Sequence, residues 1–503
     1  MGRLGDLRIN ITNFRPPDLP PAEDLASPPP RPLSGDHPTY PFENLAFEGG
    51  GTKGLAYLGA LEVLEERGLY PAHIRRASGT SSGSFLAAAV VLGMQTAELR
   101  TLLYETDLSA ILQDASLWPV GPAYNMFSAY GFNPGKRLLS FLADIFEERT
   151  GSADITLRQL LQLTGRELCV PICNLTRMTT EYCHPKTTPD MPARLAVAMS
   201  MCLPLLMRPY RLQREIGHGA GLSEEDMYVD GGLLCNFPLH VFDGWYLSLA
   251  PHDTFLQRLR PMRDAERILQ GRFSPRTDRT LGFTVFDRRE QDVTRSWSHS
   301  DPPRRPDTPL ARKRTWQDEE QDKMRAACLR LEEAVERFLE ALARLEQDGD
   351  GSIDRVEVQG LFAEGGLSRE DARLIFDTTD IHAIFDRLDS DSDGRIGFHE
   401  IQQFMDSLNV DLTSRGGVRS DDLGSVSSFI SALFNCMLMH IRQLNLGHED
   451  QWRTVAINTD YVGTSDFKLD DGDRAFLVQT GREGTMAFLD AWLERSKGIE
   501  AGY

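Results

Sequence analysis

Hydrophobic and polar positions in the first part of the chain predict a layered α/β domain. The expected elements are, in order, a strand at Asn44–Phe47, a helix through Tyr57, Leu58, Leu61 and Leu64, a strand near Ile74–Ala77 and a helix from about Ser84. A further strand is expected at Glu167–Asn174, and α/β material continues to about Arg289. Strands that alternate with helices through glycine-rich turns are typical of a sheet covered by helices.

Changes in composition predict how the rest of the chain is organised. The predicted parts are a proline-rich flexible leader (1–41), the first part of the α/β domain (42–290), a linker (291–318), a helical module (319–410), a second linker (411–425) and the second part of the α/β domain (426–498). Strand-like runs return at Thr454–Asn458 and Ala475–Gln479. The layout therefore predicts one α/β domain that is interrupted by an inserted all-α module.

The apolar segment Val426–Ile441 has two interpretations. It is expected to be a core helix of the returning α/β domain, and an amphipathic helix that contacts a membrane is the alternative. It is too short and too polar to span a bilayer. The linker before the module ends in Arg312-Lys313-Arg314, which is read as a solvated linker face, with recruitment to anionic lipid as the alternative.

The net charge of the chain limits the classes of molecule that it is expected to bind. The formal net charge is −20 and the pI is near 5.1, so nucleic acid is not an expected partner. An anionic membrane would also repel the chain unless bound cations offset its charge. The seven scattered cysteines indicate a reducing compartment. The N-terminus lacks a secretory signal pattern, and a cytoplasmic location is expected, with peripheral attachment to a membrane as the alternative.

The pentapeptide Gly79-Thr80-Ser81-Ser82-Gly83 lies between a predicted strand and a predicted helix. This G-x-S-x-G pattern in a strand–turn–helix setting is the sequence of a nucleophile elbow, with Ser81 as its nucleophile. Gly79 and Gly83 would allow the backbone to pack closely through a strained turn. An ordinary Gly/Ser-rich turn is the alternative for the pentapeptide taken alone.

Two further motifs occur in the same region. Gly49-Gly50-Gly51-Thr52-Lys53-Gly54 follows a strand and opens a helix, so its N–H groups could stabilise an oxyanion, with positive charge from Lys53 nearby. A phosphate-binding loop is the rival interpretation, but Lys53 is followed by Gly54 and not by Ser or Thr. Asp230-Gly231-Gly232 follows an apolar run, and all three motifs lie at strand ends, where they could converge.

In this order and at these separations, the three motifs resemble those of the patatin-like phospholipase family. The resemblance implies a three-layer α/β/α hydrolase domain and a Ser–Asp dyad, in which Asp230 orients and deprotonates Ser81 without a histidine. A triad that recruits His218 or His240 is the alternative. Glu48 departs from the aspartate that many members carry before the glycines.

The predicted helical module contains an acidic loop that matches the EF-hand template. The expected ligands for Ca²⁺ are the carboxylates of Asp389, Asp391, Asp393 and Glu400 and the backbone carbonyl of Arg395. A weaker partner loop is expected nearby, with ligands from Glu346, Asp348, Asp350, Ser352 and Glu357. Its first position is Glu346, whose longer side chain fits the entry position less well than aspartate.

Together these features predict a lipid acyl hydrolase that cleaves phospholipids or related lipids at a membrane surface. Calcium is expected to be regulatory or structural and not catalytic, because the dyad chemistry needs no metal. It could expose apolar surface in the module, or it could simply hold the module folded. The alternatives are a calcium-responsive binding or scaffold protein with an inactive hydrolase fold, and a lipid acyltransferase.

Overall fold

The computed structural model describes two parts of the chain that form separate compact units. The described residues are 8–10, 40–112, 114, 125, 129–213, 224–288, 290, 293–345, 352–362, 366–408, 432–433, 436–442 and 446–500. One unit, here the sheet unit, is formed by Met1–Ala311 with Arg419–Tyr503, and the other, the helical unit, is formed by Arg312–Val418.

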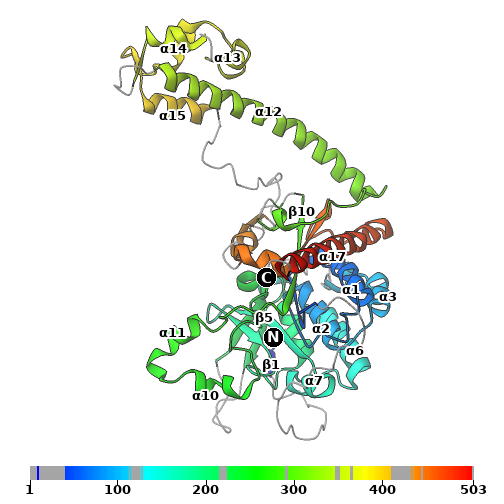
Figure 1. The fold of residues 1–503 in the computed structure, drawn as a ribbon. Helices are drawn as coiled ribbons and strands as arrows, with labels where there is room; N and C mark the ends of the chain where they lie inside the picture. The colour runs from blue at the N-terminus through cyan, green and yellow to red at the C-terminus, as the bar shows by residue number, and fades with distance from the viewer. Residues whose placement is uncertain are drawn as a thin grey trace. The chain divides into compact units, whose positions relative to one another are not determined.

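The sheet unit is built on a mixed β-sheet, which confirms the predicted α/β class (Figure 1). Its strands, in spatial order, are β1 (Arg8–Asn10), β8 (Tyr210–Gln213), β9 (Asp226–Asp230), β5 (Glu167–Asn174), β3 (Arg76–Gly79), β2 (Asn44–Phe47), β10 (Thr280–Asp287) and β13 (Thr454–Asp460), while β6 (Thr179–Cys183) pairs with β5 off this path. The pairs from β5 through β13 are parallel, and β9 runs antiparallel to β5. A separate small sheet joins β4 (Gly131–Asn133) and β7 (Leu205–Met207).

Alternate residues of β2 show how the two faces of the sheet are covered. Leu45 and Phe47 belong to the main core, which the longer helices build with the sheet. Ala46 points to the other face, where it joins a cluster with Phe237 and Leu239. Residues after Asp230 cover part of that second face, where Val241, Phe242 and Leu247 cluster with Cys169 of β5. The third layer of helices that the resemblance implies stays a prediction.

The helices of the sheet unit include one long helix close to the C-terminus. In chain order the named helices are α1 (Ala56–Glu66), α2 (Ser82–Val91), α3 (Thr96–Glu105), α4 (Leu108–Leu112), α6 (Lys136–Thr150), α7 (Leu157–Thr164), α8 (Ala193–Ser200), α9 (Gly232–Cys235), α10 (Phe255–Arg258), α11 (Ala265–Gln270) and α17 (Asp471–Glu500), and residues 436–442 are also helical. Among the described helices, none combines the length and the apolar character that crossing a bilayer requires.

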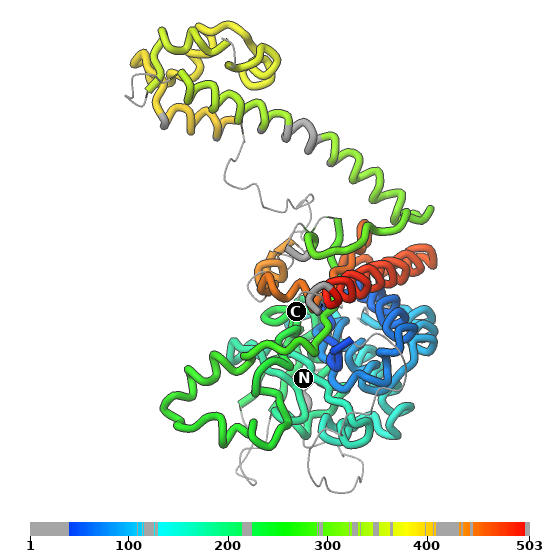
Figure 2. Tube along the Cα trace, in the orientation of Figure 1, coloured from blue at the N-terminus to red at the C-terminus, as the bar shows by residue number. Residues whose placement is uncertain are grey.

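The first and last helices of the sheet unit pack against each other, so segments distant in sequence lie side by side (Figure 2). A Cβ on Gly481 would lie 1.8 Å from the Ala56 carbonyl oxygen, and one on Gly59 would lie 1.9 Å from that of Val478. The strand predicted at Ala475–Gln479 is therefore wrong, because this run lies within α17, where Phe476, Leu477 and Val478 are buried in the main core. The strand predicted at Thr454–Asn458 is confirmed as β13.

Two element boundaries differ from the composition-based prediction. The segment 1–41, expected to be a flexible leader, contributes β1, whose backbone pairs in parallel with β8. The first predicted linker contains the start of α12 (Pro309–Leu345). Thr308 caps this helix by accepting a hydrogen bond from the Ala311 N–H at 3.1 Å, and Pro309 occupies the first turn, where its missing N–H costs nothing.

The helical unit has its own hydrophobic core. Besides α12 it contains β11 (Ile353–Asp354), α13 (Arg369–Phe376), α14 (Ile381–Leu388), β12 (Arg395–Ile396) and α15 (Phe398–Ser407). Phe338, Phe376 and Phe404 lie at its centre, with ring centroids 5.1 Å apart for the first pair and 5.0 Å apart for the second. The short strands β11 and β12 pair antiparallel, so that Ile353 lies opposite Ile396.

Candidate active site and candidate metal site

Ser81 lies in a sharp turn between the end of β3 and the start of α2. Its φ of 52° and ψ of −129° are rare for a residue with a side chain, and such strain is concentrated at functional positions. Two glycines permit the turn. A Cβ on Gly79 would lie 2.0 Å from the Gly83 carbonyl oxygen, and one on Gly83 would lie 2.5 Å from that of Phe47. The backbone therefore has the geometry of a nucleophile elbow.

A buried serine that the sequence did not single out holds this turn. The Ser81 N–H donates to Ser200 Oγ at 3.1 Å, and that hydroxyl donates to the Pro171 carbonyl at 2.8 Å. Ser84 Oγ donates to the Ser81 carbonyl at 2.6 Å. Ser200 is completely buried at the end of α8. A lone polar residue in the Ala- and Met-rich run before Cys202 was the signal that could have identified it.

Asp230 ends β9 and is 2% exposed. Its Oδ1 accepts the Gly232 N–H at 2.7 Å, while Oδ2 is buried and has no hydrogen-bond partner among the described residues. Burial raises the pKa of Asp230 to about 7, against smaller lowering effects of the Ser81 hydroxyl and the Gly232 N–H. Because the Ser81 hydroxyl is among the groups that affect this pKa, the side chains of Ser81 and Asp230 lie close together.

The glycine turn lies beside Ser81. A Cβ on Gly49 would lie 3.0 Å from the Ser81 Cβ. The Gly49 N–H donates to the Asn236 carbonyl at 3.0 Å, and the Gly50 N–H donates to Ser82 Oγ at 3.2 Å. Among the described residues, the Gly51 N–H donates to none. Gly50 and Gly51 therefore remain the better candidates for oxyanion donors, since a serine hydroxyl can rotate away from the Gly50 N–H.

Gly51 has to be a glycine. Its φ is +54°, and a Cβ there would lie 2.3 Å from the Thr464 carbonyl oxygen. Gly231 likewise faces backbone, since its Cβ would lie 2.1 Å from the Pro171 carbonyl oxygen. These close approaches explain why the motifs contain glycine at both positions.

Lys53 is 2% exposed, and its ammonium forms an ion pair with Glu290 at 2.5 Å. Although burial lowers the pKa of Lys53, Glu290 and Asp287 outweigh that effect and raise it. The Lys53 charge is thus compensated by Glu290 within the protein, and its predicted contribution of positive charge near an oxyanion stays a prediction. Pairing with a residue so far along the chain could not be read from the motif.

Asn236 links the glycine turn to the Asp230 motif, and the sequence analysis gave it no role. Its Nδ2 donates to the Gly49 carbonyl at 3.0 Å and to Glu48 Oε1 at 3.2 Å. A Cβ on Gly232 would lie 2.8 Å from its Oδ1. Its position shortly after Asp230-Gly231-Gly232 was the only hint in the sequence.

The two histidines considered for a triad are not placed at Ser81 by the described structure. His240 contacts Tyr182 and Phe273, with its Nε2 3.3 Å from the Tyr182 hydroxyl. Burial, followed by Arg272, lowers the pKa of His240 to about 4. His218 lies outside the described residues. Within them, no histidine forms a hydrogen bond with Ser81 or Asp230.

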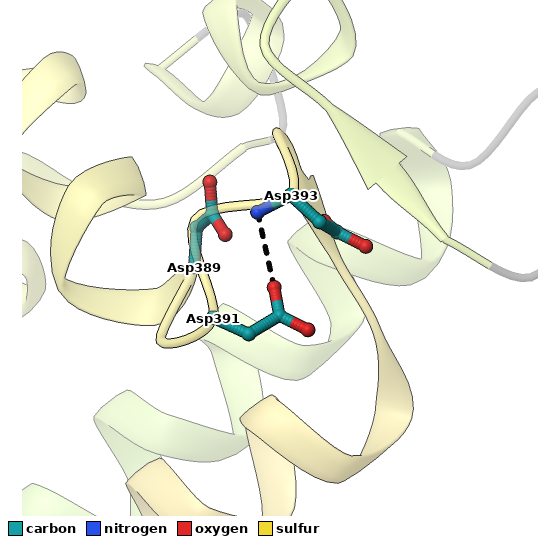
Figure 3. Close-up of side chains that lie close together, drawn as sticks. All are labelled: Asp389, Asp391 and Asp393. Carbon is teal, nitrogen blue, oxygen red and sulfur yellow. Dashed lines mark hydrogen bonds between the residues drawn. The ribbon is translucent and has the colours of Figure 1, made fainter.

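In the helical unit, Asp389, Asp391 and Asp393 project from one turn between α14 and β12 (Figure 3). One carboxylate oxygen of each lies within 4.8 Å of the others. Asp389 is 5% exposed, and its Oδ1 is buried without a hydrogen-bond partner among the described residues. A buried carboxylate oxygen without a donor is expected to be costly unless a cation binds it. The arrangement therefore fits a hard cation with oxygen ligands.

Glu400 closes the same loop. Its Oε1 accepts the Ser390 N–H at 2.7 Å, and its Oε2 accepts the Gly397 N–H at 2.8 Å. Burial raises the pKa of Glu400, but the N–H groups of Gly397, Ser390 and Asp391 together lower it below its usual value. Arg395 belongs to β12, where the loop meets its neighbour. The ionised form of the Glu400 carboxylate is thus favoured by the backbone of this loop.

The partner loop is described only in part. Glu346, Asp348 and Asp350 lie outside the described residues. Ser352 Oγ accepts a hydrogen bond from Arg395 Nη1 at 3.2 Å, and Glu357 Oε2 accepts the Asp354 N–H at 3.0 Å. A second metal site at this loop stays a prediction.

Comparison with known proteins bears on the sheet unit. Residues 45–243 match the family described as patatin-like phospholipase. This stretch contains the glycine turn, Ser81 and Asp230, and the match supports that family for this part of the chain.

Three relatives in sequence are similar to parts of the chain. The chain is 28% identical over 202 residues to the uncharacterized protein R571 of Acanthamoeba polyphaga mimivirus, covering 40% of this chain and 62% of that protein. It is 28% identical over 265 residues to the uncharacterized protein YqhO of Bacillus subtilis (strain 168), covering 49% and 84%. It is 25% identical over 207 residues to the probable lipid hydrolase 463L of Invertebrate iridescent virus 6, covering 41% and 64%. The matched part thus spans less than two thirds of R571 and of 463L.

Among solved structures, VipD from Legionella pneumophila is similar at 16% sequence identity with a TM-score of 0.38, covering 90% of this chain and 67% of that one. A likeness at this level carries no argument about activity.

Proposed function

We propose that the protein is a serine lipid acyl hydrolase of the phospholipase A type, with Ser81 as nucleophile and Asp230 as general base. One observation carries the proposal. Ser81 occupies a strained strand-to-helix turn beside a buried carboxylate whose pKa is raised to about 7. A base whose pKa is near the working pH combines a useful ionised fraction with strong proton affinity.

The reaction would proceed in two halves. Asp230 takes the proton from Ser81 Oγ as that oxygen bonds to the acyl carbonyl carbon, and the carbonyl oxygen becomes an oxyanion. When the tetrahedral intermediate collapses, the bond to the alcohol oxygen breaks, and the proton on Asp230 passes to the leaving alcohol. Water then attacks the acyl-enzyme with the same assistance, which releases a fatty acid and restores the Ser81 hydroxyl.

The oxyanion would be stabilised by backbone donors. Gly51 offers an N–H that is not engaged among the described residues, and Gly50 offers one that a rotation of the Ser82 hydroxyl would free. The N-terminus of α2 begins directly after Ser81 and adds partial positive charge. Removing a single donor of this kind typically lowers kcat by about 10²–10³-fold.

The test is release of fatty acid from mixed phospholipid vesicles and from a soluble short-chain ester by the full-length protein. Native protein should release acid, and Ser81→Ala should abolish release while melting normally. Ser78→Ala is the matched control, because Ser78 is a buried serine of β3, the strand that leads into the Ser81 turn, and its hydroxyl donates to the Pro238 carbonyl at 3.3 Å.

Three outcomes would count against the proposal. Equal activity of native protein and Ser81→Ala would remove Ser81 from the mechanism. Failure of native protein on every substrate, with or without calcium, would favour a binding or scaffold role. Transfer of the acyl group to an added alcohol in preference to water would make the protein an acyltransferase.

We further propose that the helical unit binds Ca²⁺ in an EF-hand loop, through the carboxylates of Asp389, Asp391, Asp393 and Glu400 and the carbonyl of Arg395. The unpartnered, buried Oδ1 of Asp389 supports the site. A weaker site at Glu346, Asp348, Asp350, Ser352 and Glu357 belongs to the same proposal, and the pairing of β11 with β12 is consistent with two adjoining loops.

Bound Ca²⁺ would supply charge compensation and order in the helical unit, and its role would be regulatory or structural. Calorimetric titration of the metal-free chain with Ca²⁺ gives the number of sites. Two sites would support both loops, one would support the loop at Asp389 alone, and none would refute the calcium proposal. Activity in excess EGTA and in Ca²⁺ then separates a switch from a purely structural ion.

A further inference from the structure

Glu48 stands directly before the glycine turn and is completely buried. Its Oε2 accepts hydrogen bonds from the Thr284 hydroxyl and, at 3.3 Å, from the Val285 N–H. Its Oε1 accepts from Asn236 Nδ2 at 3.2 Å. A carboxylate held by so many donors fixes the backbone on either side of it, and the next residue on one side is Gly49.

The strongest partner of Glu48 comes from the far end of the sequence. Residues 436–442 form a helix, here called the return helix, because the chain re-enters the described sheet unit there after the helical unit. Arg442 Nε in this helix donates to Glu48 Oε1 at 2.7 Å, across 394 residues of sequence. Arg442 is 6% exposed, and its Nη2 also donates to the Val285 carbonyl at 3.4 Å.

The buried charges around the turn are balanced through Arg442. Glu290 lies 2.5 Å from Lys53 Nζ and 3.8 Å from Arg442 Nη1, so Arg442 is shared by two carboxylates. Burial raises the pKa of Glu48, and Arg442 is the largest influence that lowers it again. Without the guanidinium, this carboxylate would lose its main compensating charge in a site that water barely reaches.

The return helix also reaches the Asp230 side of the site. Leu438 Cδ2 would lie 3.6 Å from a Cβ on Gly232. Leu438, Met439 and Arg442 line a small cavity together with Gly49 and Asn236. The return helix therefore lies against both the glycine turn and the motif that carries Asp230.

We propose that Arg442 is a positioning residue of the hydrolase: it holds Glu48, and through Glu48 it holds the Gly49–Gly51 turn in the conformation that presents oxyanion donors to the substrate. This inference rests on the proposed hydrolase function. Arg442 touches neither Ser81 nor the reacting atoms, so its effect falls on the transition state, where the oxyanion forms, more than on substrate binding.

The experiment measures kcat and KM of the full-length protein on a soluble short-chain ester, so that contact with a membrane does not enter. Arg442→Met should lower kcat by about 10²–10³-fold, as loss of an oxyanion donor does, with KM changed by less than about threefold. Arg442→Lys, which keeps the charge but has fewer donors, should recover part of the loss. An unchanged kcat in Arg442→Met would overturn the proposal.

Arg453→Met is the matched control. Arg453 is also a buried arginine, paired with Asp243 and Asp450 at 2.8 Å, but it does not contact the glycine turn. Arg453→Met should lower the melting temperature about as much as Arg442→Met does, while kcat of the folded protein stays at the native value. If both arginine variants lose kcat equally, the effect of Arg442 is a general loss of structure and the proposal fails.

A double variant tests whether Arg442 acts through Glu48. Glu48→Gln with Arg442→Gln replaces the ion pair by a neutral pair that can still form a hydrogen bond, and it keeps the test available if Arg442→Met folds poorly. The loss of kcat in this double variant should be well below the product of the losses in Glu48→Gln alone and Arg442→Gln alone, because each single change breaks the same contact. Independent, multiplicative losses would contradict a route through Glu48.

The outcomes separate this inference from the proposed function. If native protein hydrolyses the ester and Ser81→Ala does not, the hydrolase stands whatever Arg442 does. If native protein is inactive on every substrate, the function fails first and the inference falls with it.

Discussion

The sheet unit and the helical unit each contain a carboxylate in a demanding environment, and the two environments act in opposite directions. Asp230 is buried with few donors, so its pKa is raised to about 7. Glu400 is also partly desolvated, but three backbone N–H groups lower its pKa below the usual value. One carboxylate is prepared to take up a proton and the other is prepared to stay ionised beside a cation. Deep burial with few donors at Asp230, and shallower burial with three N–H donors at Glu400, separate the two kinds of chemistry.

The largest expected effect is the loss of activity when Asp230 can no longer accept the Ser81 proton. Asp230→Asn should lower kcat by roughly 10³-fold or more, since an amide cannot accept the Ser81 proton. Steady-state hydrolysis of a soluble ester measures the loss. Asp226→Asn, at the other end of the same strand, is the control and should retain activity, because Asp226 pairs with Arg177 at 3.1 Å and lies outside the site. Activity in Asp230→Asn close to the native level would assign the base elsewhere.

The acidic loop of the helical unit is tested by measuring calcium affinity. Asp389→Ala should weaken Ca²⁺ binding by about 100-fold, because even residues behind the ligands typically cost 10–100-fold. Calorimetric titration of the metal-free protein gives the dissociation constant for Ca²⁺. Asp386→Asn serves as the control, since this exposed aspartate of α14 pairs with Arg355 and not with the loop. Equal affinities of native protein and Asp389→Ala would place any calcium site elsewhere.

The pH dependence sharpens the assignment of Asp230. The base must be ionised to act, so kcat/KM should rise about tenfold per pH unit below a pKa of about 7 and level off above it. Rates on an uncharged ester, checked for enzyme stability at each pH, give the profile. A rate that is flat from about pH 5 to pH 8 would mean that the working base has an ordinary carboxylate pKa.

The smallest expected effect concerns stability. Because the folded-state pKa of Asp230 lies above its unfolded value, the folded protein holds the extra proton, and stability falls as the pH rises through about 7. Asp230→Asn removes this penalty and should raise the melting temperature of the sheet unit by about 2–4 °C at pH 8. The gain should shrink towards acidic pH. A lower melting temperature at pH 8 would mean that the ionised carboxylate stabilises the fold.

Local patterns predicted much of the fold and some of the site. The strand at Asn44–Phe47, the turn at Ser81 and the strand at Glu167–Asn174 could be read because each depends on nearby residues. The run at Ala475–Gln479 was read wrongly because an apolar stretch of that length fits a strand or a buried helix equally well. The partners of Lys53 and Glu48 lie 237 and 394 residues away. No single-sequence pattern connects such pairs, so the charge balance around the glycine turn could only be seen in the folded structure.

The adjacency of β10 and β13 also bears on how the chain reaches its fold. These two strands pair in parallel, yet the Thr459 hydroxyl bonds to a carbonyl 173 residues earlier in the sequence. During synthesis, β10 therefore cannot pair with β13 until the whole helical unit has been made. Loop closure costs only about 0.6 kcal/mol for each doubling of loop length, so the insertion weakens the finished sheet little. Its cost is kinetic, because β10 presents an open parallel edge to other chains until β13 arrives.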